Sequence, residues 1–107
     1  MEKVLGKIDF AEYGTVKDHP FLIGIQLGFS MSGSGVMDGG KYTVNISSAC
    51  KWNEHSREGT ITSTVEKVAE ILKAAKVNYV SELVGKPVEI TIDKNSFVDF
   101  RILTEVL

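Results

Sequence analysis

The sequence predicts an α+β fold in which an antiparallel sheet of about four or five strands packs against one long helix and ends in a β-hairpin. Two patterns carry this prediction. Apolar residues alternate with other residues in 21–29 and 88–92, as the period of two in a strand requires. Residues 60–75 instead repeat apolar side chains at helical spacing. The length of 107 residues is typical of one domain, so residues 1–107 are predicted to form a single domain.

Two strands are expected in the first part of the chain, at Val4–Tyr13 and Phe21–Phe29, with a turn region between them. Gly24 and Gly28 remove side chains from one face of the second strand, which favours close packing and also leaves space for a ligand. The predicted inner faces hold alternate residues: Val4, Ile8 and Phe10 in the first strand, and Phe21, Ile23, Ile25, Leu27 and Phe29 in the second.

The segment Ser30–Gly40 is predicted to be a loop, because four of its eleven residues are glycine. It is either a hairpin connection or a nest of backbone N–H groups that binds phosphate, and Asp38 is either a turn residue or a contact to a ligand hydroxyl. The candidate ligand-binding glycines are Gly33, Gly35, Gly39 and Gly40. A third strand is expected at Lys41–Ile46, with Tyr42, Val44 and Ile46 on one face. Lys41 and Tyr42 join the candidate ligand-binding set.

The long helix is predicted to begin after Asn53, a favourable N-cap. One turn is expected at Ser81–Gly85, then a hairpin with a turn at Asp93–Ser96 and a last strand at Phe97–Val106. The predicted sheet-facing side of the helix holds Ile61, Val65, Val68, Leu72 and Ala75, and the solvent side holds Ser63, Glu66, Lys67, Glu70 and Lys73.

A second candidate site surrounds the start of this helix, where N–H groups without a helical partner favour anions. Lys51 and Arg57 supply charge there, and Trp52 offers a ring for stacking on a base, as does Tyr42. Alternatively, Trp52 forms a hydrophobic staple with Arg57 against its ring. Arg101 is either an anion ligand or the partner of a cross-strand salt bridge on the last hairpin, where Asp99 and Arg101 share a face and Glu89 and Thr91 lie on the opposite strand.

Composition argues against several functional classes. The net charge of -2 gives no basic excess for sequence-independent binding of DNA or RNA. The lone Cys50 fits a reducing compartment, and no apolar run is long enough for a signal core or a membrane span, so we expect a cytoplasmic protein. His19, Cys50 and His55 lack the spacing of a zinc site or a nucleophilic pair, and no catalytic motif is present. We therefore expect no metal, no cofactor and no enzymatic activity.

Several segments together resemble a family of small, largely uncharacterised proteins that bacteriophages and prophages encode. These segments are residues 77–90, residues 100–107, the Gly35–Gly40 loop and the pair Lys51–Trp52. After Trp52 the chain departs from the family pattern, because its helix start is less acidic. The resemblance implies a phage accessory protein of the infected bacterial cytoplasm that counters host defence.

With that resemblance, the leading hypothesis is an anti-defence protein that sequesters a nucleotide second messenger without degrading it and acts as a homo-oligomer. The messenger would be a cyclic oligonucleotide or a cyclic ADP-ribose. The alternative is a phage protein that inhibits a host protein by direct binding. A hydrolase of the messenger and a virion or replication component are further possibilities, although the absence of metal ligands and catalytic pairs counts against the hydrolase.

Overall fold

The structure, a computed structural model, describes residues 1–47 and 54–106, with 54–56 described by their backbone. It confirms the predicted α+β fold with a helix in the second half and a final hairpin. The elements in chain order are β1 (Glu2–Val16), β2 (His19–Met31), β3 (Ser34–Met37), β4 (Thr43–Asn45), α1 (Glu54–Ala75), the 3-10 turn η1 (Val80–Leu83), β5 (Pro87–Asp93), β6 (Ser96–Ile102) and the 3-10 turn η2 (Thr104–Val106).

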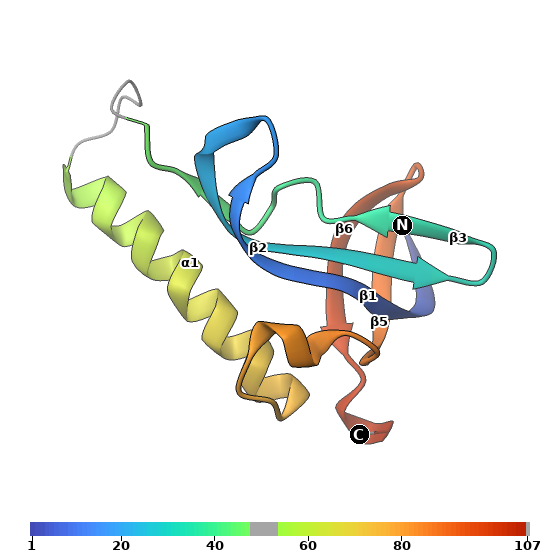
Figure 1. Ribbon diagram of the computed structural model, residues 1–107. Helices are drawn as coiled ribbons and strands as arrows, with labels where there is room; N and C mark the ends of the chain where they lie inside the picture. Colours follow the sequence, from blue (N-terminus) through green and yellow to red (C-terminus); the bar gives the residue numbers. More distant parts are fainter. Residues whose placement is uncertain (48–53, 107) are drawn as a thin grey trace.

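The sheet is antiparallel and curls on itself. Its strand order is β3-β2-β1-β5-β6, and β4 pairs with β2 beside β3. Residues 2–7 of β1 pair with β5 and residues 6–16 pair with β2, so this strand joins the two hairpins. β3 and β6 stand at opposite ends of the strand order and yet contact each other. Figure 1 shows the β5–β6 hairpin crossing the long β1–β2 ribbon.

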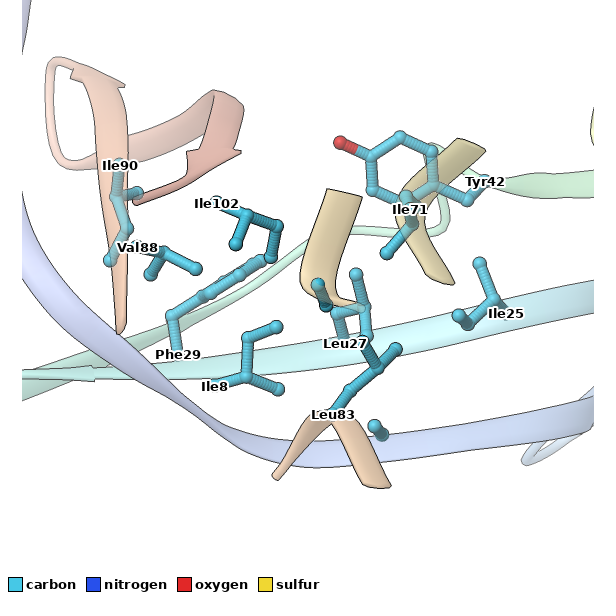
Figure 2. Close-up of a cluster of buried hydrophobic side chains, with 12 residues drawn as sticks. Ile8, Ile25, Leu27, Phe29, Tyr42, Ile71, Leu83, Val88, Ile90 and Ile102 are labelled. Carbon is cyan, nitrogen blue, oxygen red and sulfur yellow. The ribbon is translucent and has the colours of Figure 1, made fainter. Parts of the chain in front are cut away.

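The inner side of this curled sheet is filled by apolar side chains and covered at one end by α1 and η1. Figure 2 shows Phe29, Ile8 and Leu27 of the sheet meeting Ile71 of α1 and Leu83 of η1. Both hairpins and both helical elements therefore contribute to one core. The buried core residues are Ile8, Ala11, Ile25, Leu27, Phe29, Tyr42, Ile71, Ala75, Leu83, Val88, Ile90 and Ile102.

The predicted inner face of the first strand was wrong beyond Ile8. The pairing of β1 with β2 shifts between Ile8 and Phe10, which places a bulge at Asp9. An extra residue in one strand reverses which side chains face the core. Phe10 is consequently 39% exposed, and Ala11 is buried in its place. In β2 the alternation holds for Ile25, Leu27 and Phe29, while Phe21 near the strand's start is exposed.

The predicted buried face of the helix was wrong at Val65. That side chain is 57% exposed, whereas Ile71 and Ala75 are buried. Thr64 and Lys67, which precede them at helical spacing, are half-buried. The rest of the predicted face holds, because Ala75 is buried and Val68 and Leu72 pack against the core.

The predicted Ser30–Gly40 loop was wrong, because most of it continues the sheet. β2 extends to Met31, and β3 returns after a two-residue turn. The sequence does not indicate this strand, because the segment is rich in glycine and Val36 is the one apolar side chain of β3 that packs against the core. The third strand is shorter than predicted, with Ile46 exposed beyond its end. The last strand ends at Ile102, and η2 replaces its predicted continuation to Val106.

Gly24 and Gly28 are sites of close packing. A Cβ on Gly24 would overlap the carbonyl oxygen of Tyr42, which passes directly over β2. A Cβ on Gly28 would stand 2.8 Å from the Met37 sulfur and 3.0 Å from Phe10 Cβ. A Cβ on Gly24 would require the backbone of the neighbouring chain to move, whereas one on Gly28 would require the flexible Met37 side chain to move and Phe10 to shift slightly.

Candidate functional site

Asp38 is a structural turn residue in this fold. It is 6% exposed, and its Oδ2 accepts a 2.9 Å hydrogen bond from the backbone N–H of Leu27. Its Oδ1 accepts a 3.0 Å bond from the N–H of Gly40, and its own N–H donates to the Leu27 carbonyl at 3.0 Å. The carboxylate thereby fastens the turn after β3 to the middle of β2. Of the two roles predicted for Asp38, the geometry fits the turn role.

The glycine-rich segment divides between two places. Gly33 and Gly35 belong to the β2–β3 hairpin, whereas Gly39 and Gly40 form the turn before β4, with φ angles of 66° and 82°. In that turn the amides of Gly40 and Lys41 donate to the side chain and the carbonyl of Asp38. These two N–H groups are therefore unavailable as a phosphate nest, which corrects the expectation for this part of the segment.

Lys41 and Tyr42 lie in a cluster of cations and aromatic rings, which we call the Tyr42 cluster and define as Lys41, Tyr42, Lys67, Phe97, Asp99 and Phe100. The Lys41 ammonium lies 5.9 Å from the centre of the Tyr42 ring and 5.7 Å from that of Phe97. The Lys67 ammonium of α1 lies 5.9 Å from the Tyr42 ring. Two cations from different elements thus share one ring at distances at which cation–π attraction acts.

Asp99 of β6 is the acidic residue of the same cluster. The Tyr42 hydroxyl donates to Asp99 Oδ1 at 3.5 Å, and the Lys41 ammonium lies 3.9 Å from this oxygen and donates to the Val98 carbonyl. Burial raises the pKa of the Tyr42 phenol above its ordinary value, and the charges of Asp99 and Asp38 raise it further. Tyr42 therefore stays protonated as a donor. Because it is 6% exposed, its ring is part of the core and does not offer the stacking face that was predicted.

A hollow of about 180 Å³ adjoins this cluster between α1 and β6. Its apolar floor is made by Ile71, Ala74, Phe100 and Ile102, and its charged rim by Lys67, Glu70 and Arg101. Lys67 therefore belongs both to the Tyr42 cluster and to this hollow. We call the Tyr42 cluster and the hollow together the α1–β6 site.

Arg101 forms the predicted cross-strand salt bridge. Its Nε lies 3.2 Å from Glu89 Oε1, and its terminal nitrogen lies 3.3 Å from Glu105 Oε1. The hydrogen bond to Glu89 and the charge of Glu105 raise the pKa of Arg101. A hydrogen bond from its own backbone lowers the pKa of Glu105, and Arg101 lowers it further. Since Arg101 is about half-exposed, such ion pairs contribute little stability and exchange readily for other anions.

The remaining predicted residues lie around the start of α1. Arg57 donates a 3.2 Å hydrogen bond to the carbonyl of Ile46, which ties the first turns of the helix to the end of β4. Lys51 and Trp52 lie outside the described residues, as do Cys50 and Asn53. A site made jointly by Trp52 and Arg57 therefore stays a prediction.

A larger cleft of about 430 Å³ lies at the other end of the curled sheet. Gly35 lines it together with Ser32 and Ser34 of the β2–β3 hairpin. Among the described residues that line this cleft, Glu2 is the one ionisable side chain. It therefore lacks the cations that a phosphate-bearing ligand needs.

Sequence reasoning identified Lys41, Tyr42 and Arg101 but gave no ligand-binding role to Lys67 or Asp99, the two further charged residues of the Tyr42 cluster. Lys67 was assigned to the solvent side of the helix, and Asp99 was considered as a salt-bridge partner within the hairpin. Both contacts are non-local, since Lys67 reaches Tyr42 from α1 and Asp99 reaches Lys41 and Tyr42 from β6. The signal that was available is Tyr42 itself, because a buried phenol requires a polar partner.

Within residues 1–47 and 54–106, no cluster of three or more histidine, cysteine or acidic side chains is placed to hold a metal ion. In the same part of the chain, no helix has the length and apolar character needed to span a membrane. Comparisons with protein-family models, curated proteins and solved structures found no match.

Proposed function

We propose that this protein captures a nucleotide-derived second messenger, of the cyclic oligonucleotide or cyclic ADP-ribose type, at the α1–β6 site without degrading it. One observation carries the proposal. Lys67 of α1 and Arg101 of β6 line one apolar hollow, and Lys41, in the turn before β4, meets Lys67 at the Tyr42 ring beside it. Phosphate groups are recognised by such convergent cations, and the apolar floor suits the face of a base.

The cations of the site are held in ion pairs that are weak enough for an anion from solution to compete with their carboxylates. Lys41 pairs with Asp99 at 3.9 Å and Lys67 with Glu70 at 3.9 Å, both between side chains that are at least one-third exposed. Exposed pairs of this kind are worth about 0–1 kcal/mol, so a phosphate can displace their carboxylates at little cost. Displacement of Asp99 would also free the protonated Tyr42 hydroxyl, which donates to that carboxylate in the unbound protein.

The size of the hollow supports the expectation of a homo-oligomer. At about 180 Å³ it is smaller than the roughly 300–1,000 Å³ of pockets that enclose a small-molecule ligand. A cyclic dinucleotide bound there would leave most of its surface in water. A second copy of the chain placed over the ligand would bury the remainder, so we expect one ligand to be shared by two or more copies.

The test begins with protein freed of carried-over nucleotide by unfolding and refolding. It is incubated with cyclic dinucleotides, cyclic trinucleotides and cyclic ADP-ribose isomers, filtered, and heated to release what it retained. Recovery of one intact nucleotide, with a light-scattering mass that shows shared ligand, is the expected result. If no nucleotide of the panel is retained, the proposed function is wrong.

A matched pair of helix variants places the ligand. Lys67→Gln removes a cation of the site, whereas Lys73→Gln removes an exposed lysine from the same helix outside it. We expect Lys67→Gln to weaken binding about tenfold or more, as loss of a charge-assisted hydrogen bond does. Lys73→Gln should bind as the unchanged protein does. Equal affinities for the two variants would exclude the α1–β6 site.

Trp52 provides an independent test of the site predicted at the start of α1. It is the sole tryptophan of the chain, so intrinsic emission excited at long wavelength reports on its surroundings alone. A ligand that stacks on Trp52 would quench this emission at the concentrations at which it is retained. Binding with unchanged emission would separate Trp52 from the ligand and leave the α1–β6 site.

Inhibition of a host protein is the second candidate, favoured by apolar side chains on the outer face of the sheet. Phe10 is 39% and Met37 is 52% exposed, and they flank Gly28 on this face, with Leu5 further along β1 at 67%. Solvent-exposed apolar groups that adjoin each other mark interaction surfaces. Recovery of one stoichiometric host protein by the unchanged chain, and its loss with Phe10→Ser and Met37→Ser combined, would favour this function.

A further inference from the structure

The cleft at the far end of the curled sheet shares no lining residue with the α1–β6 site. It lies between the start of β1, the β2–β3 hairpin, and the β5–β6 hairpin with its turn. Its volume of about 430 Å³ falls within the range of pockets that hold small molecules. In Figure 1 this end of the sheet, near the N-terminus and β3, lies away from α1.

The cleft is lined by apolar side chains that lie on the inner face of the sheet, beyond the part that α1 and η1 cover. Val4, Met31, Val36 and Ile92 come from β1, β2, β3 and β5 and line the cleft. Val36 pairs with the buried Phe29, and Val4 with the buried Ile90, so both belong to the inner face of the sheet. All four apolar side chains are nevertheless only half-buried. A ligand in the cleft would bury them as α1 and η1 bury the other end.

The polar groups of the cleft define the charge that it accepts. Ser32, Ser34 and Asn95 supply hydrogen-bonding groups at its rim, and Glu2 supplies a carboxylate. Among the described residues, no lysine, arginine or histidine lines the cleft; Lys94 precedes Asn95 in the hairpin turn but is not part of the lining. A negatively charged ligand would meet this carboxylate without compensation, whereas an ammonium group would form a charge-assisted hydrogen bond with it.

From this arrangement we propose that the cleft binds a small organic amine, with an apolar body against Val36 and Ile92 and its ammonium group on Glu2. The four strands provide the apolar contacts that hold the body, and the two serines and Asn95 accept hydrogen bonds from the remaining N–H groups. This site would take a cation, while the proposed messenger is an anion. The two proposals therefore concern different residues and stand independently.

The test uses three indoles that share one ring and differ in charge: tryptamine, 3-ethylindole and indole-3-acetate. Each is titrated into ¹⁵N-labelled protein, and amide shifts are followed by NMR. We expect tryptamine to shift the amides of Ser34, Gly35 and Val36 and to bind most tightly. 3-Ethylindole should shift the same amides at higher concentration, and indole-3-acetate should bind most weakly.

Two variants assign the carboxylate and the cavity. Glu2→Gln should weaken tryptamine by up to about fivefold and leave 3-ethylindole unchanged, because only an ion pair with an exposed carboxylate is lost. The matched control is Glu12→Gln, which removes an exposed carboxylate of the same strand that does not line the cleft. Ser34→Phe places a ring in the cleft from β3, where aromatic residues suit a strand, and should abolish binding of both probes.

Three outcomes would overturn the proposal. Absence of shifts at the three β3 amides with every probe would show a hollow that binds nothing of this class. Equal or tighter binding of indole-3-acetate would show that the charge assignment is wrong, as would equal effects of Glu2→Gln and Glu12→Gln. Because none of these probes is a nucleotide, failure here leaves the messenger proposal to its own test.

Discussion

The two ends of the curled sheet place the same kind of side chain in different surroundings. At the end covered by α1 and η1, Ile25 and Leu27 are 0% exposed, and Ile71 is 4% exposed. At the other end, Val4 and Val36 also face inward but remain half-buried around a cleft of about 430 Å³. The strands are continuous between these ends, since β1 and β2 pass through both.

This difference shows that strand alternation determines which way a side chain points, but the covering elements determine whether it is buried. α1 contacts β4, β6 and η1, and η1 contacts β1. These contacts lie at one end, where the backbone of Ile8 bonds to Gly85 and Lys86 just after η1. Stability should therefore be concentrated at the covered end, and ligand binding at the other end and at the outer rim of α1.

The largest expected effect comes from Leu83, the buried side chain through which η1 enters the core. It is 0% exposed and packs in the cluster with Ile8 and Ala75. Leu83→Ala should lower the free energy of unfolding by about 2–5 kcal/mol, since it removes buried apolar area and leaves a cavity. Urea unfolding followed by circular dichroism measures this change.

Two further substitutions make that experiment a comparison of the ends. Val84→Ala, one residue on at a side chain that is 53% exposed, should change stability by less than about 0.5 kcal/mol. Val36→Ala truncates an inward-facing valine at the cleft and should cost less than about 1 kcal/mol, because its side chain is already partly solvated. A loss at Val36 as large as that at Leu83 would contradict the division between the ends.

A smaller effect is expected at Gly24, where the chain before β4 crosses over β2. Gly24 pairs with Gly14 of β1, which makes the two positions a matched pair within one ladder. Gly24→Ala should cost about 1–3 kcal/mol, because the new methyl group would overlap the Tyr42 carbonyl and force the backbone there to move away from β2.

Gly14 is the control for that substitution. A Cβ there meets no atom within 4 Å, so Gly14→Ala should be neutral or stabilise by up to about 1 kcal/mol through the unfolded state. Both changes are measured by urea unfolding. Equal costs at the two positions would mean that loss of backbone freedom, and not the crossing chain, decides the requirement for glycine at Gly24.

The parts of the fold that the sequence predicts are those with strong local patterns. Alternation predicts the inner face of β2 from Ile25 to Phe29, and the helix and the final hairpin follow from their own periodicities. The failures have non-local causes. The bulge at Asp9 is a shift in the pairing of β1 with β2, so it depends on both strands and not on the sequence of β1 alone. β3 is a strand because it pairs with the end of β2, although glycine favours turns.

The candidate site was predictable only in part, for the same reason. Lys41 and Tyr42 adjoin in the sequence, and the pairing of Arg101 with Glu89 follows from hairpin register. The approach of Lys67 to Tyr42 depends on how α1 crosses the sheet, which no local pattern specifies. The cleft exists because none of the helices that the structure describes covers that end of the sheet. No single segment of the sequence can therefore indicate it.

The smallest effect at neutral pH, and the most specific, is expected from Tyr42 at the edge of the covered end. Burial and the charge of Asp99 raise the pKa of its phenol, whereas in the unfolded chain a tyrosine ionises near about pH 10. Because the folded-state pKa is the higher one, this stability is complete below about pH 10 and is lost as the pH rises further, by up to about 1.4 kcal/mol per pH unit.

Tyr42→Phe loses one long hydrogen bond, so it should cost less than about 1 kcal/mol at pH 7 and remove that slope from urea unfolding between pH 10 and 11. Tyr79→Phe, at a side chain that is 70% exposed, should keep the slope of the unchanged protein. Equal slopes for the two variants would mean that the Tyr42 hydroxyl is not buried beneath Lys41 and Lys67. Tyr42 would then belong to the open end of the sheet and not to the covered end.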